Sequence, residues 1–456
     1  MRPFLGLSQP RLRLLLVISE LLLIAALAFR ASQRQLTLVL LLPIGIAVVL
    51  AFLRWPALGL VAASVAGLIV PYLGPSGLNA STILVALLLG LWLLDMMVRP
   101  NQIQLVPSRT FWSWLAFLVV AVISFGIGQL PWLTFALHAP LGAQLGGLAI
   151  IVLSAGVFLL AANRIPDLRW LSWITWAFLA AGAMLLLVRS VLPALGIPTQ
   201  NVFLTIGTVF YIWMVAMAFS QAIFNTDLHP GWRLVLGGVV LITLYVLVFL
   251  KFEDKSGWLS AFACIAAIIA ARSWRVGLAL IPVAILSALL LWSGLVATDE
   301  YSISTRFDAW AIMFQIIRIS PLLGLGFANY YWYTPLFPIR GYAVSFNSHN
   351  NYVDIVAQTG VVGLVCFLWL LWEVGRLGWQ LRTQVTGGFA QAYVYGSLGG
   401  LAGMVVAGML GDWVLPFFYN LGLNGFRSSM IGWLFLGGLV SLQQMLIRQK
   451  PTATQQ

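Results

Sequence analysis

The sequence predicts an all-α, polytopic integral membrane protein, and three observations support this class. Hydrophobic residues make up 61% of the 456-residue chain and charged residues only 8%, whereas an average soluble domain has about 25% charged residues. Several apolar runs reach about 18 residues or more, the length of a helix that crosses a bilayer core. The runs lack the period-two alternation of membrane strands, so we expect helices, whose backbone groups are satisfied internally.

Run length and flanking residues predict about 12–14 transmembrane helices, with membrane lipids as the surrounding partner. The third and tenth runs are short, which gives the range in this number. The expected spans cover residues 12–29, 36–53, 57–73, 80–98, 111–130, 142–163, 170–192, 203–224, 232–250, 256–271, 276–295, 352–374, 390–411 and 430–447.

The basic residues indicate an orientation rather than a nucleic-acid partner. The formal net charge is +12, but Lys and Arg occur singly or in pairs between apolar runs, so no nucleic acid is expected. With alternating spans, most of the 24 Lys and Arg residues fall on one side, and the positive-inside rule predicts that both termini are cytoplasmic. Several of the outer basic residues are clustered in two neighbouring segments: Lys251, Lys255, Arg306, Arg318 and Arg340.

The longest non-spanning stretch, residues 296–350, is expected on the outer side and predicts a surface helix. Thr305 and Asp308 have the spacing of a capping box, which predicts a helix start there, and Pro321 predicts its end. One apolar stripe of this helix contains Phe307, Trp310, Ala311, Phe314 and Ile317. We expect this helix to lie along the membrane surface.

Polar and basic residues gather in three outer segments, "KFEDKSGWL", "STRFDAW" and "SHNNY". The candidates in them are Lys255, Arg306 and His349, and Arg189 in "LLLVRSVLP" is a fourth. Cationic side chains bind phosphate oxygens, and a neutral histidine accepts a proton from an attacking hydroxyl. Together they favour a lipid-linked phosphate substrate and a hydroxyl acceptor at the outer membrane surface.

Each candidate also has an ordinary structural interpretation. His349, beside two asparagines, suits the capped start of a helix. Arg306 and Arg189 could extend to lipid headgroups, and Lys255 could pair with a neighbouring carboxylate. His138 and His229 lie in short loops and carry no functional expectation. The motifs HExxH, CxxC and GxxxxGK[ST] are missing from the sequence, so neither a metal site nor a cofactor is expected.

In their order along the chain, these motifs resemble the O-antigen ligase and O-antigen polymerase superfamily. The order is a Lys255-Ser256-Gly257-Trp258 turn, then Arg306 leading into "PLLGLGFANY", then "SHNNYVDIVAQTGVVGL". The resemblance covers about residues 240–380. It divides the chain into an N-terminal transmembrane bundle (1–240), a family-like catalytic core (241–380) that includes the external loop 296–350, and C-terminal helices with a short cytoplasmic tail (381–456).

The resemblance implies a bacterial, metal-independent glycosyltransferase on the outer face of the cytoplasmic membrane. The donor would be a glycan on undecaprenyl diphosphate, and the acceptor a hydroxyl of another glycan, of lipid A core or of a protein. These acceptors correspond to a polymerase, a ligase and a protein oligosaccharyltransferase, and ligase and polymerase are favoured equally. No large external domain is expected, which disfavours the protein acceptor.

The family pattern assigns roles to individual residues of this chain. It assigns His349 as the general base and Arg306, with Arg189 as a further candidate, as ligands of the diphosphate. Many members have arginine where this chain has Lys255, which keeps the charge but lacks the bidentate fork. Asn350 or Asp354 is expected to support the site by orienting the imidazole.

Two other classes of function remain open from the sequence. A transporter or flippase of lipid-linked glycans would use ionisable residues in mid-membrane, where Glu20 and Asp95 are among the few acidic candidates. A scaffold of a polysaccharide export machine would have no need of His349. The clustering of charge at the outer ends of the spans favours surface chemistry over both.

Overall fold

The fold of the chain is all-α, as predicted. The structure is a computed structural model that describes residues 33–71, 73–98, 105–197, 207–279, 282 and 300–449. These residues form helices, and their only β-type pairings are two isolated bridges. The chain divides into two compact units, residues 1–56 and 57–456, and helix α2 (Gln33–Arg54) lies in the first unit.

The second unit contains all elements that bear on the candidate site. Its elements are α3 (Pro56–Ile69), η1 (Pro75–Gly77), α4 (Ala80–Val98), α5 (Arg109–Ile127), α6 (Leu141–Arg164), α7 (Leu168–Leu186), η3 (Leu187–Val191), α8 (Leu192–Ala194), α9 (Thr208–Phe224), α10 (Pro230–Tyr245), η4 (Val246–Leu250), α11 (Lys255–Arg272), α13 (Glu300–Ile317), α14 (Asn329–Tyr333), η5 (Thr334–Leu336), α15 (Asn351–Leu381), α16 (Gly388–Leu410) and α17 (Gly422–Gln449). Only α3 begins one residue earlier, at the boundary of the first unit.

The protein is a multi-pass membrane protein by helix length and composition. Within the described ranges, nine helices are long and apolar enough to cross a bilayer, or ten if α2 and α3 form one span. The expected span 203–224 corresponds to α9, which is shorter at 17 residues. The expected span 12–29 and most of 276–295 lie outside the described residues. Large apolar side chains such as Leu234 (78% exposed) and Phe249 (72%) lie on the outside of the bundle, as in helices that face lipid.

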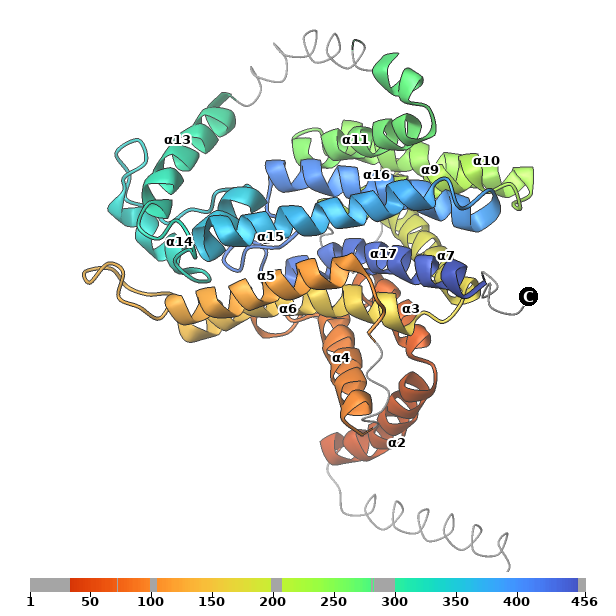
Figure 1. Cartoon of the computed structure of the whole chain (residues 1–456), viewed down its shortest axis with the longest axis horizontal. Helices are drawn as coiled ribbons and strands as arrows, with labels where there is room; N and C mark the ends of the chain where they lie inside the picture. The colour runs from red at the N-terminus through yellow and green to blue at the C-terminus, as the bar shows by residue number, and fades with distance from the viewer. Residues whose placement is uncertain are drawn as a thin grey trace, which may run out of the picture. The chain divides into compact units, whose positions relative to one another are not determined.

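Helix α17 forms the centre of the bundle. It packs along α6, α9 and α16, while α11 flanks α16 and α5 runs beside α15 (Figure 1). Its Trp433 meets Trp114 of α5 edge to face, with ring centroids 5.0 Å apart. Its Phe435 stacks on Trp213 of α9, also at 5.0 Å. These aromatic contacts hold the helices that carry the candidate site in one packed unit.

Contacts between helix termini define two ends of this bundle. We call one the His349 end: there Arg306 Nη1 donates to Leu410 O (3.1 Å) and Asn351 Nδ2 to Leu415 O (2.7 Å). The start of α9 also lies at this end, because Ser428 Oγ of α17 donates to Gly207 O (3.1 Å). At the opposite end Arg382 Nη1 donates to Ala271 O and Ser441 Oγ to Ile165 O. The candidates Lys255, Arg189, Arg306 and His349 all belong to the His349 end.

The glycine motifs form a backbone clamp on α15. Helix α15 is broken at Gly360, whose φ of 70° and ψ of −178° are not helical. Across this break, Leu325 N and Gly326 N donate to Ala357 O and Gln358 O (2.9 and 3.1 Å). Val361 N and Val362 N donate back to Pro321 O and Leu322 O (2.9 and 3.2 Å). The "PLLGLG" segment and the "QTGVV" segment therefore fix the first part of α15 against the loop that follows α13.

The helix expected in this stretch is present as α13, but its predicted start and its predicted capping residue were wrong. It begins at Glu300 rather than near Thr305, and Asp308 pairs with Arg340 (Nε to Oδ2, 2.7 Å) instead of capping the helix. Phe307 and Phe314 of the expected stripe are about 60% exposed. The face buried in the protein consists of Ala309, Ile312, Met313, Ile316 and Ile317, of which Ile317 belongs to that stripe. Because α13 has apolar residues on both faces, periodicity could not show which one packs on the protein.

Candidate functional site

His349 is presented by an unusual and well-fixed backbone. Its φ is 48°, in the left-handed region, which is uncommon for a residue other than glycine. Its neighbours Ser348 and Asn350 are buried, whereas His349 itself is exposed. Trp310 Nε1 of α13 donates to Ser348 O (2.8 Å), and Asn350 N donates to Ser348 Oγ (3.1 Å). The flanking residues therefore hold the turn, and the imidazole is left accessible to a substrate.

A buried carboxylate supports this turn from inside. Asp354, one turn into α15, accepts hydrogen bonds at Oδ1 from Ser348 Oγ (2.7 Å) and from Tyr330 Oη (2.6 Å). Tyr330 is fully buried, and burial together with the neighbouring Asp354 raises the pKa of its phenol, so it remains a donor. Asn350 or Asp354 was expected to orient the imidazole of His349. Asp354 instead accepts a hydrogen bond from Ser348, the residue before His349, and thus fixes the turn rather than the ring.

Arg306 and Asp412 are the charged groups that act on His349. Partial removal of water from the ring lowers the pKa of His349 below its usual value of 6.5, the carboxyl of Asp412 raises this pKa, and the guanidinium of Arg306 lowers it. The pKa of His349 is lowered overall, so the imidazole is neutral at pH 7. Neutral imidazole is the form that accepts a proton.

Asp412 was not among the residues expected from the sequence. It lies in the loop between α16 and α17 and is 1% exposed, with Phe417 N donating to Oδ2 (3.0 Å) and Asn420 Nδ2 to Oδ1 (2.7 Å). Burial raises the pKa of Asp412 above its usual value, and these two hydrogen bonds offset only part of the rise. A signal existed in "GDWVLP", a lone acidic residue at the end of an apolar run. Only the fold shows that this residue approaches His349.

The two asparagines after His349 are structural. Asn350 caps α15, because its Oδ1 accepts from Tyr352 N (2.9 Å) and Val353 N (3.3 Å). Asn351 binds the backbone of the α16–α17 loop, accepting from Val414 N (2.8 Å) and donating to Leu415 O (2.7 Å). The capping interpretation thus holds for Asn350, and Asn351 fixes the loop that carries Asp412.

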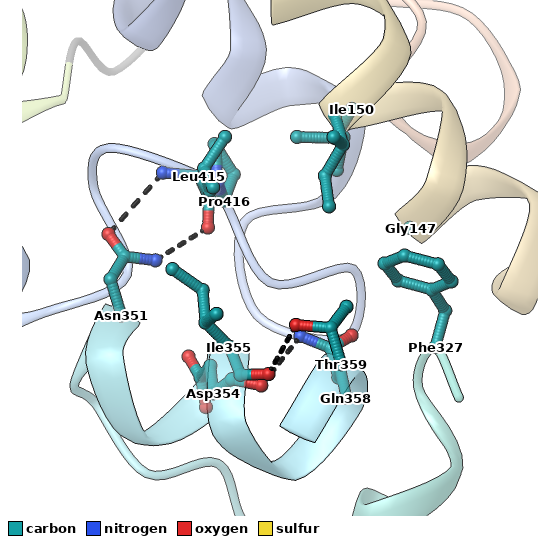
Figure 2. Close-up of a pocket in the computed structure, with 11 residues that line it drawn as sticks. Gly147, Ile150, Phe327, Asn351, Asp354, Ile355, Gln358, Thr359, Leu415 and Pro416 are labelled. Atoms are coloured by element: carbon teal, nitrogen blue, oxygen red, sulfur yellow. Dashed lines mark hydrogen bonds between the residues drawn. The ribbon is translucent and has the colours of Figure 1, made fainter. Parts of the chain in front are cut away.

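A narrow pocket opens beside Asp354, between α6 and the first turns of α15. Figure 2 shows its polar wall, where the Asn351 amide faces the Leu415 backbone. The free space at the centre of the pocket fits about one water molecule. Asp354 Oδ2 is buried without a hydrogen-bond partner among the described residues. A water at this place would complete the hydrogen bonding of Asp354.

Lys255 and Arg189 lie at the His349 end but in different surroundings from Arg306. Lys255 is the first residue of α11, whose cap is Asp254: its Oδ1 accepts from Ser256 Oγ (2.5 Å) and Gly257 N (3.3 Å). The carboxylate of Asp254 is therefore hydrogen-bonded to the first turn of α11. Arg189 lies in the π-helical turn η3 and is half-buried. Its electrostatic neighbour is Arg427 of α17, a residue that the sequence did not single out.

The geometry therefore divides the candidate cations into two groups. Arg306 lies with His349 and Asp412, whereas Arg189 lies with Arg427. No protein-family model and no curated protein matches the chain. What the described structure supports directly is a multi-pass helical membrane protein with an exposed histidine and basic residues at one end of its bundle.

Proposed function

We propose that the chain is a glycosyltransferase of the outer face of the bacterial cytoplasmic membrane, with both termini in the cytoplasm. It transfers a glycan from undecaprenyl diphosphate to an acceptor hydroxyl, as an O-antigen ligase or a polysaccharide polymerase. The observation that carries this proposal is His349: an exposed imidazole with a lowered pKa, in a left-handed turn between buried residues, near Arg306 and Asp412.

The residues fit a balanced transfer step. The acceptor oxygen forms a bond to the anomeric carbon of the donor sugar, and its proton passes to His349. The bond between that carbon and the diphosphate oxygen breaks, and the lipid diphosphate leaves with the electron pair. Arg306 stabilises the negative charge on the leaving diphosphate, and Asp412 stabilises the imidazolium that forms on His349. Lys255 and Arg189 remain further candidates for diphosphate binding.

Two features weigh against the transporter alternative. Asp95 of α4, a candidate for a mid-membrane ionisable group, pairs with Arg164 (Oδ2 to Nη2, 2.5 Å) at the end opposite to His349. The exposed imidazole and its charged neighbours lie at a helix terminus, where a surface reaction needs them. A flippase would move the glycolipid between leaflets of a vesicle without forming a glycosidic bond, and that measurement separates the two functions.

The proposal is tested with purified protein, glycan-loaded undecaprenyl diphosphate and the candidate acceptors. We expect transfer by the wild type with a chelator present, and a loss of roughly 10²- to 10⁴-fold for His349→Ala. His229→Asn is the matched control, because His229 caps α10 at the opposite end and asparagine keeps that cap. Transfer by His349→Ala at a rate close to wild type would exclude the assigned base.

A further inference from the structure

Arg427 is a buried cation with a donor that has no partner among the described residues. It lies in the second turn of α17 and is 3% exposed. Its Nη2 atom is buried and makes no hydrogen bond to any described residue. A guanidinium has five donors and does not lose its charge, so burying one without an anion is costly in a membrane protein. Such an arrangement indicates that a group outside the described residues binds the side chain of Arg427.

The surroundings of Arg427 add positive charge instead of compensating for it. Its one charged neighbour among the described residues is Arg189, and no described carboxylate acts on it. The next residue, Ser428, contacts the start of α9, where Phe210 N donates to Ser428 Oγ (3.1 Å). The N-cap of α9, Gly207, provides no side-chain cap. The positive end of the α9 dipole therefore lies beside Arg427.

The backbone around Arg427 is fixed by contacts with α3 and the start of α4. Asn79 Nδ2 donates to Leu423 O (2.7 Å), which ties the start of α17 to α4. A Cβ at Gly67 of α3 would clash with Ser81 Oγ and lie 3.2 Å from Cβ of Arg427. Helices α3 and α4 thus enclose the stem of Arg427 on one side, while α9 contacts the adjoining turn of α17.

We propose that Arg427 and Arg189 together bind a phosphate group at the start of α9. Two guanidinium groups can donate to the same phosphate, each with two parallel hydrogen bonds, and the α9 dipole adds to the attraction. The other side of the α9 start carries charges of both signs, because Thr208 Oγ1 donates to Asp254 Oδ2 (3.5 Å) and lies 3.2 Å from Ser256 Oγ, next to Lys255. The phosphate belongs to a lipid, either the diphosphate of the glycan donor or a phospholipid headgroup; its assignment to the donor rests on the proposed function.

The test measures binding and stability in nanodiscs of phosphatidylcholine, with undecaprenyl diphosphate, phosphatidylglycerol or inorganic pyrophosphate added. We expect undecaprenyl diphosphate to bind the wild type and Arg427→Met to weaken this binding about 10- to 100-fold. Arg427→Lys should give an intermediate affinity, since lysine keeps the charge but not the fork. Arg448→Met, at the other end of the same helix, is the matched control and should bind normally.

Stability in the absence of ligand distinguishes binding from a structural role. Because removing an unpaired buried charge relieves a cost, the ligand-free Arg427→Met variant should unfold at the same or a higher temperature than the wild type. Normal affinity in Arg427→Met overturns the proposal, and so does a lower unfolding temperature without a loss of affinity. In the double variant Arg427→Met with Arg189→Gln, the losses of affinity caused by the two substitutions should not add, because both residues bind the same phosphate.

The source of the phosphate follows from the same experiment. If the wild type prefers undecaprenyl diphosphate over phosphatidylglycerol, the bound phosphate belongs to the glycan donor. If it binds both lipids equally, the bound phosphate is that of a phospholipid headgroup. His349→Ala should lose transfer and retain binding. If the wild type binds the lipid diphosphate but transfers no glycan, the proposed function fails while the phosphate site stands. If transfer proceeds and Arg427→Met binds normally, only the phosphate site fails.

Discussion

Replacement of Gly360 by alanine is the most direct test of the clamp that positions the site. The φ of 70° and ψ of −178° at Gly360 form a combination that is almost restricted to glycine. A Cβ there would also collide with backbone atoms of Leu322 and Leu323. Backbone atoms cannot rotate away as a side chain can, so the substitution must displace the loop, the helix or both.

The magnitude follows from two contributions. Forcing alanine into this conformation costs about 1–3 kcal/mol. Displacement breaks some of the four backbone hydrogen bonds between residues 321–326 and 357–362, each worth about 0.5–1.5 kcal/mol. We therefore expect Gly360→Ala to lower the free energy of unfolding by about 3–6 kcal/mol. Thermal unfolding in detergent or nanodiscs measures the change.

Gly341→Ala is the matched control for this prediction. Gly341 also has a positive φ, 86°, but a Cβ there would meet nothing within 4 Å. Its substitution should cost only the conformational part, about 1–2 kcal/mol. Equal losses of stability in the two variants would refute the argument that backbone contact at Gly360 fixes α15.

The remaining predictions concern the site. Arg306→Gln should move the acid side of the pH–activity profile to higher pH, because the cation lowers the pKa of His349. Asp412→Asn should move the acid side of this profile to lower pH, because the Asp412 carboxyl raises the pKa of His349. Profiles of transfer rate against pH check both predictions. Shifts in the same direction for the two variants would contradict the geometry. Asn351→Ala should destabilise the protein by about 2–5 kcal/mol in thermal unfolding, because it leaves buried backbone groups of the α16–α17 loop unpaired. Asn350→Ala should cost about 0.5–2 kcal/mol and Asn350→Asp much less, since aspartate also caps a helix; similar losses would argue against the cap.

The fold class could be predicted from the sequence because the bilayer imposes it. Apolar runs of sufficient length leave helices as the only structure with satisfied backbone groups, and the runs at 80–98 and 390–411 closely match α4 and α16. The orientation of α13 could not be predicted in this way. Both of its faces carry apolar side chains, so the choice between them depends on the hydrophobic cluster around Tyr330 and Phe417, which residues distant in sequence create.

Parts of the candidate site could be predicted where a local sequence pattern marks the residue. His349 stood out as a polar residue at the start of an apolar run, and the cap at Asn350 follows from residue type alone. Asp412 and Arg427 were missed for one shared reason. Each is a single charged residue near the end of a span, and its significance arises only from neighbours brought together by packing, such as Arg189 beside Arg427.

The two charged groups that act on the pKa of His349 differ in a way that suits the proposed reaction. Arg306 and Asp412 have opposite charges and act on the pKa of His349 in opposite directions. A site with charges of both signs suits an imidazolium that exists only while a proton is transferred. Among the described residues, the charged neighbour of Arg427 is the cation Arg189 and one donor of Arg427 has no partner, which matches a ligand that is negative throughout. In the proposed reaction a hydroxyl attacks the anomeric carbon of a glycan on a lipid diphosphate, and this requires both environments: one that holds a permanent anion and one that accepts a proton.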